Sequence, residues 1–401
     1  MKKEKTKTTP FSSANRFNST YIDPSQKKSS AAQALEKLGI PIQENRPDRL
    51  SDYRKGKRTF SVLPKKGEAM DTCATFSNDY VCCNVKVLKS VSNCPYDCSY
   101  CFLQNYLNDA GSSVVGDTDA LIAEVNEKID KEPWRFFRIG TWELGDSLAL
   151  ESVSHQARDL VLAFSKLKNA VLELKTKSDC VESLLGLDHQ KKTVVSWSLN
   201  TDTIISQQEH RTASLEARLK AIDAVAKAGY LLGFHFDPMI LHSDWEKKYS
   251  TLITRLFRIV KPDQVAWISI GSLRFNPEMK KKMETHFPAS AISAEEMILG
   301  PDGKMRYTKP IRLAMYKLLY SQLQQAIGLE QLSPTGSITK QKPLVYFCME
   351  RWDVWNKIFG EHPESVAHLD YLFAKNIHER FPEITKQKPI LTNYKDAEKN
   401  T

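Results

Sequence analysis

Short apolar runs alternate with longer amphipathic stretches over the middle of the chain. Six of these runs predict strands, at Val81–Leu88, Arg135–Gly140, Ala170–Leu174, Thr193–Leu199, Leu231–Phe236 and Gln264–Ile270. The stretches between them predict helices, at Asp119–Ile129, Ser154–Leu167, Cys180–Leu185, Ser214–Ala228 and Ser243–Val260. The alternation indicates an α/β fold with a parallel sheet, either doubly wound or curved into a partial barrel. In both cases we expect the functional residues in the loops that follow the carboxyl ends of the strands.

The two flanking segments lack this alternation. Residues 1–70 are rich in Lys, Ser, Thr, Asn and Pro, which predicts a largely flexible arm with one short helical stretch. Residues 71–290 contain the strand–helix alternation and form the predicted catalytic domain. Residues 291–401 are predicted to form a C-terminal α+β extension. It begins with a hairpin and continues with a long helix and a strand, at Met297–Leu299, Lys304–Thr308, Pro310–Ile327 and Leu344–Cys348.

The net charge of +9 is unevenly distributed along the chain. Residues 1–70 contain 16 Lys/Arg and 7 Asp/Glu, whereas the remainder contains 41 of each sign, so the arm accounts for the whole excess. A basic arm of this kind indicates either binding to a polyanion such as nucleic acid or a solvated tail that aids solubility. The N-terminus has no apolar signal region, and no apolar run is long enough to span a bilayer. We therefore expect a cytoplasmic location without membrane contact. A monomer is the expected oligomeric state, although these features do not determine it.

Six of the eight cysteines lie between residues 73 and 101, which points to metal or redox chemistry rather than a disulfide framework. Cys94, Cys98 and Cys101 form a C-x3-C-x2-C motif directly after the first predicted strand. Three thiolates bind three irons of a 4Fe–4S cluster and leave the fourth iron open to another ligand. A structural zinc site would need a fourth ligand and usually contains C-x2-C pairs. The spacing therefore favours an iron–sulfur cluster.

In this position the cysteine motif resembles that of the radical S-adenosylmethionine (AdoMet) superfamily. The longer segments Tyr100–Gln104, Thr176–Lys177, Ser198–Asn200 and Ala226–Phe234 resemble the spore photoproduct lyase family, and the resemblance covers roughly residues 80 to 320. It implies a partial (β/α)6 barrel, a 4Fe–4S cluster and AdoMet as cofactor. It also implies reductive cleavage of AdoMet to a 5′-deoxyadenosyl radical, with the electron supplied by a donor such as flavodoxin or ferredoxin. In that family the radical starts the repair of a cross-linked thymine dimer in DNA.

The resemblance also implies roles for individual residues. Cys94, Cys98 and Cys101 match the cluster ligands, and four residues at or after strand ends match positions that hold the polar end of AdoMet: Lys177, Ser198, Asn200 and Glu143. Four residues after the sixth strand and on the predicted hairpin suit phosphate contact or base stacking: Arg274, Lys304, Arg306 and Tyr307. His235 and Asp237, at the end of the fifth strand, are predicted either to line the substrate cavity or to belong to the core.

Two positions depart from the family pattern. Members of the family carry a cysteine after the second strand that returns a hydrogen atom to the product, and residues 140–147 contain no cysteine here. The tyrosine that follows the third cluster cysteine in the family is Phe102 here. The leading prediction is a radical AdoMet enzyme that repairs or modifies a nucleic-acid base, with the DNA thymine photoproduct as first choice. The alternatives are a radical AdoMet enzyme with a non-DNA substrate and a nucleic-acid-binding protein whose cluster is structural or redox-sensing.

Overall fold

A curved sheet of eight strands forms the centre of the molecule in the computed structural model, which describes residues 17–46, 52–73, 80–109 and 111–399. The strand order is β19 (Leu344–Phe347), β15 (Val265–Ser272), β14 (Leu231–Met239), β12 (Thr193–Ser198), β11 (Ala170–Thr176), β10 (Phe137–Gly140), β6 (Lys86–Leu88) and β4 (Met70–Thr72). All neighbours pair in parallel except β4, which runs antiparallel to β6. The predicted α/β partial barrel is confirmed.

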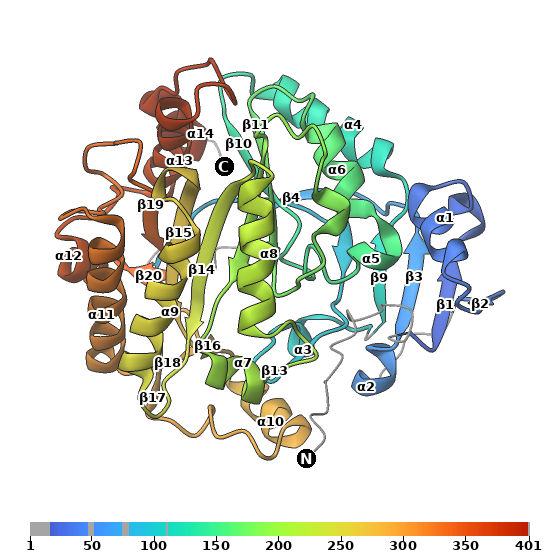
Figure 1. Ribbon diagram of the computed structural model, residues 1–401, viewed down its shortest axis with the longest axis horizontal. Coiled ribbons are helices and arrows are strands. Elements are labelled where there is room, and N and C mark those ends of the chain that lie inside the picture. Colours follow the sequence, from blue (N-terminus) through green and yellow to red (C-terminus); the bar gives the residue numbers. More distant parts are fainter. Residues whose placement is uncertain (1–16, 47–51, 74–79, 110, 400–401) are drawn as a thin grey trace, which may run out of the picture.

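Helices cover the outer face of this sheet (Figure 1). They include α4 (Thr118–Lys131), α6 (Gln156–Phe164), α8 (Leu215–Lys227), α9 (Trp245–Ile259) and α11 (Lys309–Ile327). The predicted helix over 154–167 begins later, because the backbone of His155 adopts a positive φ of 53° and separates α6 from the short helix α5 (Glu151–Ser154). Only one turn of 3-10 helix, Glu182–Leu184, forms where a helix over 180–185 was predicted. Among the described residues, no helix is long and apolar enough to cross a membrane.

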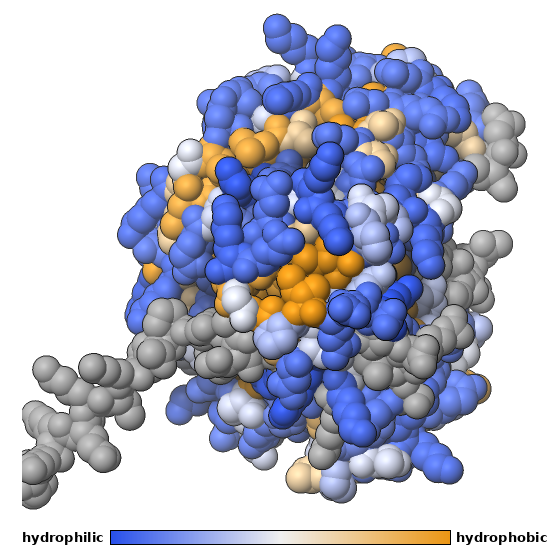
Figure 2. All heavy atoms as spheres, turned by 90° about the vertical axis from the view of Figure 1, so that its right-hand side faces the viewer, coloured by the Kyte–Doolittle hydropathy of each residue, from blue (hydrophilic) through white to orange (hydrophobic). Residues whose placement is uncertain are grey.

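A second, five-stranded sheet contains much of the segment that was predicted to be a flexible arm. Its order is β2 (Ile42–Gln43), β1 (Ser19–Ile22), β3 (Thr59–Leu63), β9 (Ser112–Val115) and β7 (Val91–Ser92). Phe60 and Val62 are fully buried under α1 (Ser30–Lys37), with Val114 and Leu35 in the same core. The unit forms the right side of Figure 1 and faces the viewer in Figure 2, where hydrophilic residues surround a hydrophobic area.

The flexible-arm prediction therefore differs from the structure for residues 17–46 and 52–63, while residues 1–16 lie outside the described residues. Composition gave no sign of this fold because β3 pairs with β9, some fifty residues further along the chain. The predicted domain limits are also crossed by both sheets. Strands β7 and β9 fall within the predicted catalytic domain but belong to the N-terminal sheet. Strand β19 falls within the predicted extension but belongs to the barrel sheet.

The predicted hairpin forms after the barrel and gains a third strand. Strands β17 (Met297–Leu299) and β18 (Met305–Tyr307) pair antiparallel, and β16 (Arg274–Phe275) pairs with β18 on its other side. Helix α13 (Val366–Arg380), which was not predicted, packs the Phe373 ring against Trp267, with ring centroids 5.8 Å apart.

One buried carboxylate, Glu173 of β11, accepts hydrogen bonds from side chains on four other strands. Its Oε2 accepts from Arg138 Nε and Nη2 of β10, at 3.0 and 2.7 Å. Its Oε1 accepts from Ser196 Oγ of β12 at 2.9 Å and from Trp267 Nε1 of β15 at 2.8 Å, and lies 2.9 Å from His235 Nε2 of β14. Burial alone would raise the pKa of Glu173, but Arg138 and these hydrogen bonds hold it well below its usual range.

Replacing Glu173 with Gln is expected to lower the free energy of unfolding by about 3–5 kcal/mol, because it leaves the buried Arg138 guanidinium without a counter-charge. Urea unfolding of the cluster-free protein measures the change. Glu216→Gln is the matched control, since Glu216 pairs with Arg255 at the surface and such pairs contribute less than about 1 kcal/mol. Equal losses in the two variants would contradict the role given to Glu173.

Candidate active site

A cavity of about 570 Å³ opens at the carboxyl ends of the barrel strands. It is lined by residues at the ends of successive strands: Thr176 and Lys177 from β11, Ser198 from β12, His235 and Asp237 from β14, Ser269 from β15, and Cys348 after β19. Cys94, Cys98 and Cys101 line the same cavity. The structure thus brings the predicted cysteine motif and the predicted strand-end residues into one site, where a parallel sheet places its functional groups.

The cysteine loop is held by the N-terminal unit and by the loop after β10. Lys57, which is 1% exposed, donates from Nζ to the carbonyl oxygen of Cys94 at 2.6 Å. The backbone nitrogen of Asn93 donates to the carbonyl oxygen of Leu144 at 2.6 Å. Gly145 permits this approach, because a Cβ there would lie 2.7 Å from the carbonyl oxygen of Asn93. These contacts join the cysteine loop to the N-terminal unit and to the loop after β10.

The three thiols suit an iron–sulfur cluster. All three are free, Cys94 and Cys98 are each 7% exposed, and Cys101 is half-buried. Burial raises the pKa of Cys94 to about 12, so the thiolate form needs a cation beside it. Bound iron would supply that charge, since the thiolate is the form that ligates metal.

A buried ion pair supports the cysteine loop from behind. Strand β8 (Asp97–Cys98) pairs antiparallel with β13 (Glu209–His210), which sets Glu209 opposite Cys98. Glu209 accepts a hydrogen bond from the Tyr100 hydroxyl and pairs through Oε2 with Arg218 Nη2 at 2.5 Å. Burial is the largest effect and acts to lower the pKa of Lys177, but Glu209, Cys98 and Asp146 together outweigh it and the pKa is raised. Lys177 therefore remains a cation, 5.7 Å from the centre of the Tyr100 ring.

Asp146 joins the loop after β10 to the end of β11. Its Oδ1 accepts from Thr176 Oγ1 at 2.6 Å and from the backbone nitrogens of Leu148 and Ala149 at 3.0 and 2.9 Å. Its Oδ2 accepts from the backbone nitrogen of Lys177 at 2.7 Å. Asp146 thereby positions Lys177 and closes the loop that carries Glu143, and both of these residues line the cavity.

Three of the four residues predicted to bind AdoMet line the cavity, and the fourth does not. Lys177, Ser198 and Glu143 line the cavity with the cysteines. Asn200 does not, because it is 1% exposed and its amide is used within the fold. Its Nδ2 donates to the carbonyl oxygen of Pro238 at 2.9 Å, and its Oδ1 accepts from the Tyr249 hydroxyl at 2.6 Å. Asn200 therefore shapes the end of β12, and its assignment as a cofactor ligand does not fit the structure.

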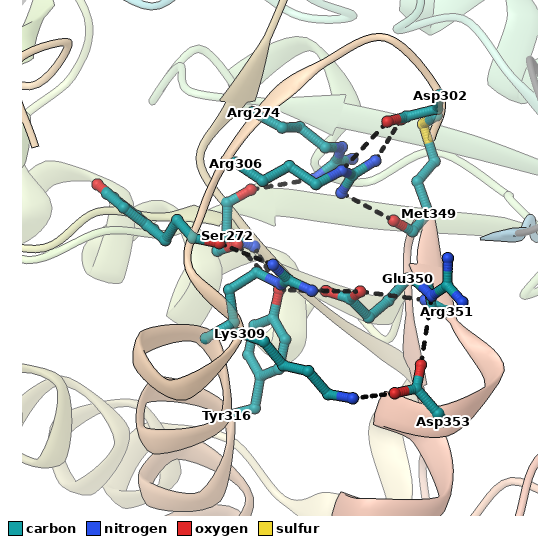
Figure 3. Close-up of polar contacts among 12 residues, drawn as sticks. Ser272, Arg274, Asp302, Arg306, Lys309, Tyr316, Met349, Glu350, Arg351 and Asp353 are labelled. Atoms are coloured by element: carbon teal, nitrogen blue, oxygen red, sulfur yellow. Dashed lines mark hydrogen bonds and ion pairs between the residues drawn. The ribbon is translucent and has the colours of Figure 1, made fainter. Parts of the chain in front are cut away.

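The residues predicted to contact nucleic acid also divide into two groups. Arg306 is 2% exposed, pairs with Asp302 and donates to the carbonyl oxygen of Met349 at 3.1 Å (Figure 3). Tyr307 is fully buried, and its hydroxyl accepts from the backbone nitrogen of Leu241 at 3.1 Å. Both belong to the scaffold of the hairpin, and this corrects the prediction that they face a nucleic acid.

Arg274 and Lys304 do line the cavity. Arg274 forms a two-pronged ion pair with Asp237, at 2.7 and 3.1 Å, and its Nη2 lies 3.6 Å from Cys348 Sγ. Cys73 and Cys83 are further thiols in the cavity lining, whereas Cys180 is not part of it.

Several of the supporting residues were not found by sequence reasoning. Lys57, Glu209 and Arg218 are charged residues far from the cysteine motif, and their burial depends on partners that only the fold supplies. Glu173 had one usable signal, since a carboxylate inside an apolar strand needs a buried partner.

A partial barrel with a C-x3-C-x2-C loop and a cation at its carboxyl end defines a radical AdoMet enzyme. Comparison with known proteins gives the family, because residues 39–335 match the family described as spore photoproduct lyase. The chain belongs to the spore photoproduct lyase family.

Similar proteins agree with this assignment, and solved structures share the fold. The chain is 27% identical to the spore photoproduct lyase of Bacillus subtilis (strain 168) over 296 residues, which are 69% of this chain and 84% of that protein. It is 24% identical to the Clostridium acetobutylicum enzyme over 250 residues, 62% of this chain and 72% of that protein. A solved spore photoproduct lyase complexed with dinucleoside spore photoproduct shares the fold, with a TM-score of 0.68 at 21% identity, covering 82% of this chain and 98% of that one. A variant with bound AdoMet and the same dinucleoside gives a TM-score of 0.69 with the same coverage.

Proposed function

We propose that this protein repairs a thymine photoproduct in DNA by radical AdoMet chemistry. The observation that carries the proposal is one cavity that holds both the three cluster cysteines and a polar far wall, formed by Asp237 and Arg274. When bound, the cluster and AdoMet supply a 5′-deoxyadenosyl radical that removes a hydrogen atom from the substrate. A nucleic-acid partner, a flavodoxin- or ferredoxin-type electron donor and a cytoplasmic location belong to the same proposal.

The residues at the cysteine end of the cavity suit the polar end of AdoMet. Cys94, Cys98 and Cys101 would hold three irons of a 4Fe–4S cluster. The Lys177 ammonium suits the carboxylate of the methionine part, and the Glu143 carboxylate suits its ammonium group. The Ser198 hydroxyl adds a neutral hydrogen-bonding group at the end of β12.

The far wall suits a polar heterocycle. The Asp237–Arg274 pair and Lys304 offer acceptors and donors to a base or to its backbone. His235 contacts Glu173 through Nε2 and lies 3.1 Å from Ser269 Oγ through Nδ1. Burial lowers the pKa of His235 to about 4, so the ring is neutral near pH 7 and adds no charge to this wall of the cavity.

Replacing Cys94, Cys98 or Cys101 with Ala is expected to abolish cluster binding and AdoMet cleavage, because each thiolate binds a separate iron. Iron and sulfide content and 5′-deoxyadenosine formation measure the two effects after anaerobic reconstitution. Cys180→Ala, outside the cavity, is the matched control and should retain both. Full iron content and cleavage in all three variants would refute the cluster assignment.

DNA that carries the thymine photoproduct is expected to increase 5′-deoxyadenosine formation several-fold and to yield restored thymine. Undamaged DNA of the same sequence is the control, and chromatography with mass spectrometry measures both products. Slow AdoMet cleavage that ignores the damage would reject the repair reaction and support a radical enzyme with another substrate. A reduced cluster whose paramagnetic resonance spectrum is unchanged by AdoMet would instead support a structural or redox-sensing cluster.

The return of a hydrogen atom to the product needs a weak X–H bond in the cavity. Residues 140–147 contain no cysteine, and Cys180 lies outside the cavity lining. Cys348 lines the far wall beside Arg274, and burial raises its pKa, which keeps the hydrogen on sulfur. The S–H bond of Cys348 would break as a product C–H bond forms, and a one-electron reductant with a solvent proton would restore the thiol.

Cys348→Ala is expected to form 5′-deoxyadenosine but to yield less restored thymine per 5′-deoxyadenosine than the unmodified protein. In D2O, the deuterium that exchanges onto the thiol should appear in the thymine of the unmodified protein and be reduced in that of the variant. Cys83→Ala is the control within the cavity. An unchanged ratio and an unchanged deuterium content in Cys348→Ala would remove Cys348 from the reaction.

A further inference from the structure

The five-stranded N-terminal sheet has one apolar face and one hydroxyl-lined face. Phe60 and Val62 of β3 point into the core, so Ser61 between them points to the opposite face. Ser61 pairs in register with Ser113 of β9, and Ser113 pairs with Ser92 of β7. Three serines therefore lie side by side across three neighbouring strands, on the face away from α1.

A pocket of about 310 Å³ lies over this row, in addition to the cavity of the barrel. Its charged lining consists of Arg46, Lys66 and Lys89 with one carboxylate, Asp109. Arg46 Nη2 lies 3.6 Å from Asp109 Oδ2, and Lys89 pairs at 2.9 Å with an Asp71 carboxylate outside the lining. Lys66 forms no ion pair within the described residues. The lining holds three cations and one carboxylate, and once Asp71 is counted the excess is one positive charge, that of Lys66.

The hydroxyl groups of the three neighbouring serines have no hydrogen-bond partner within the described protein. Within the described part of the chain, the hydroxyls of Ser61, Ser92 and Ser113 take part in no hydrogen bond. The buried Ser90 hydroxyl, which belongs to a residue of the same lining, also lacks a partner. Hydroxyl donors under a cationic rim match a group that only accepts hydrogen bonds and carries negative charge. A phosphate has both properties, and its negative charge would complement Lys66, which pairs with no carboxylate of the described residues.

The pocket and the catalytic cavity are lined in part by the same stretch of chain. Asn105 and Tyr106 line that cavity, whereas Asp109 and Gly111, a few residues further along the same segment, line the pocket. Tyr106 is 60% exposed and packs edge-on against Phe102, which is 49% exposed. Exposed aromatic rings beside a cationic pocket are the arrangement that binds the bases and backbone of a single strand.

We infer that this pocket binds a phosphate group. If the proposed function holds, that group belongs to the DNA strand whose damaged base occupies the catalytic cavity. Part of the basic excess of residues 1–70, contributed by Arg46 and Lys66, thereby acquires a defined binding site.

The test compares Lys66→Ala/Lys89→Ala with the unmodified full-length, reconstituted protein. Lys220→Ala/Lys247→Ala is the matched control, since it removes two exposed charges from α8 and α9 on the outer side of the barrel. Fluorescence anisotropy of a labelled single-stranded oligonucleotide is measured over a range of salt concentrations. The pocket variant should bind several-fold more weakly, and its slope of log affinity against log salt should be shallower by about 0.7 for each phosphate that the variant no longer neutralises.

Two further measurements distinguish DNA phosphate from free phosphate as the ligand, and distinguish failure of the pocket inference from failure of the proposed repair function. Ser61→Ala/Ser92→Ala/Ser113→Ala should weaken oligonucleotide binding without changing the salt slope, because it removes donors and no charge. Stabilisation by inorganic phosphate that disappears in the pocket variant, with oligonucleotide affinity unchanged, would support the site and identify free phosphate as its ligand. If oligonucleotide affinity, salt slope and stabilisation by phosphate all match those of the unmodified protein, the inference is overturned. DNA that binds through the pocket but does not stimulate AdoMet cleavage would reject the repair reaction alone.

Discussion

The barrel depends on the charge of Glu173, which is held inside the sheet. A parallel sheet that closes only partway has no ring of hydrogen bonds to fix its curvature. Here one carboxylate receives hydrogen bonds from neighbouring strands on both sides of β11, and the Arg138 guanidinium balances its charge. Ser196 and Trp267 can approach it because Gly233 of the intervening β14 has no side chain. A Cβ at Gly233 would lie 2.2 Å from Ser196 Oγ and 2.8 Å from Trp267 Nε1. The interior of the barrel is thus fixed by polar contacts that tolerate little variation.

The same carboxylate reaches the active site through His235 and Trp142. His235 lines the cavity and contacts Glu173, while Trp142 lines it from the loop after β10 and lies 3.4 Å from Oε2 through Nε1. Lys175, the next inward position on β11, lies 4.5 Å from the centre of the Trp142 ring. The floor of the cavity is therefore continuous with the network that sets the curvature of the sheet. A change in that network would alter the shape of the cavity together with the stability of the fold.

Sequence reasoning found the parts of this protein whose signals are local. Strands β10, β11, β12, β14 and β15 are short runs dominated by apolar residues, and the cysteine motif is defined by spacing alone. It failed where a residue's environment depends on distant partners. Arg306 and Tyr307 look like surface residues of a hairpin until Asp302 and the backbone of Leu241 are brought beside them. The N-terminal sheet was missed for the same reason, since its strands are short and pair across long stretches of chain.

Strand β7 shows why the N-terminal unit is part of the active site rather than an appendage. Val91 packs into the N-terminal core, Ser92 belongs to the hydroxyl row, and the chain then passes through Asn93 directly to Cys94. Lys57, from the N-terminal unit, donates from Nζ to the side-chain oxygen of Asn93 and to the backbone carbonyl oxygen of Cys94. A strand of nucleic acid held on the open face would therefore rest against the segment that positions the cluster. The proposed phosphate pocket and the cysteine loop are therefore neighbours along the chain, because Ser92 and Cys94 are separated by one residue.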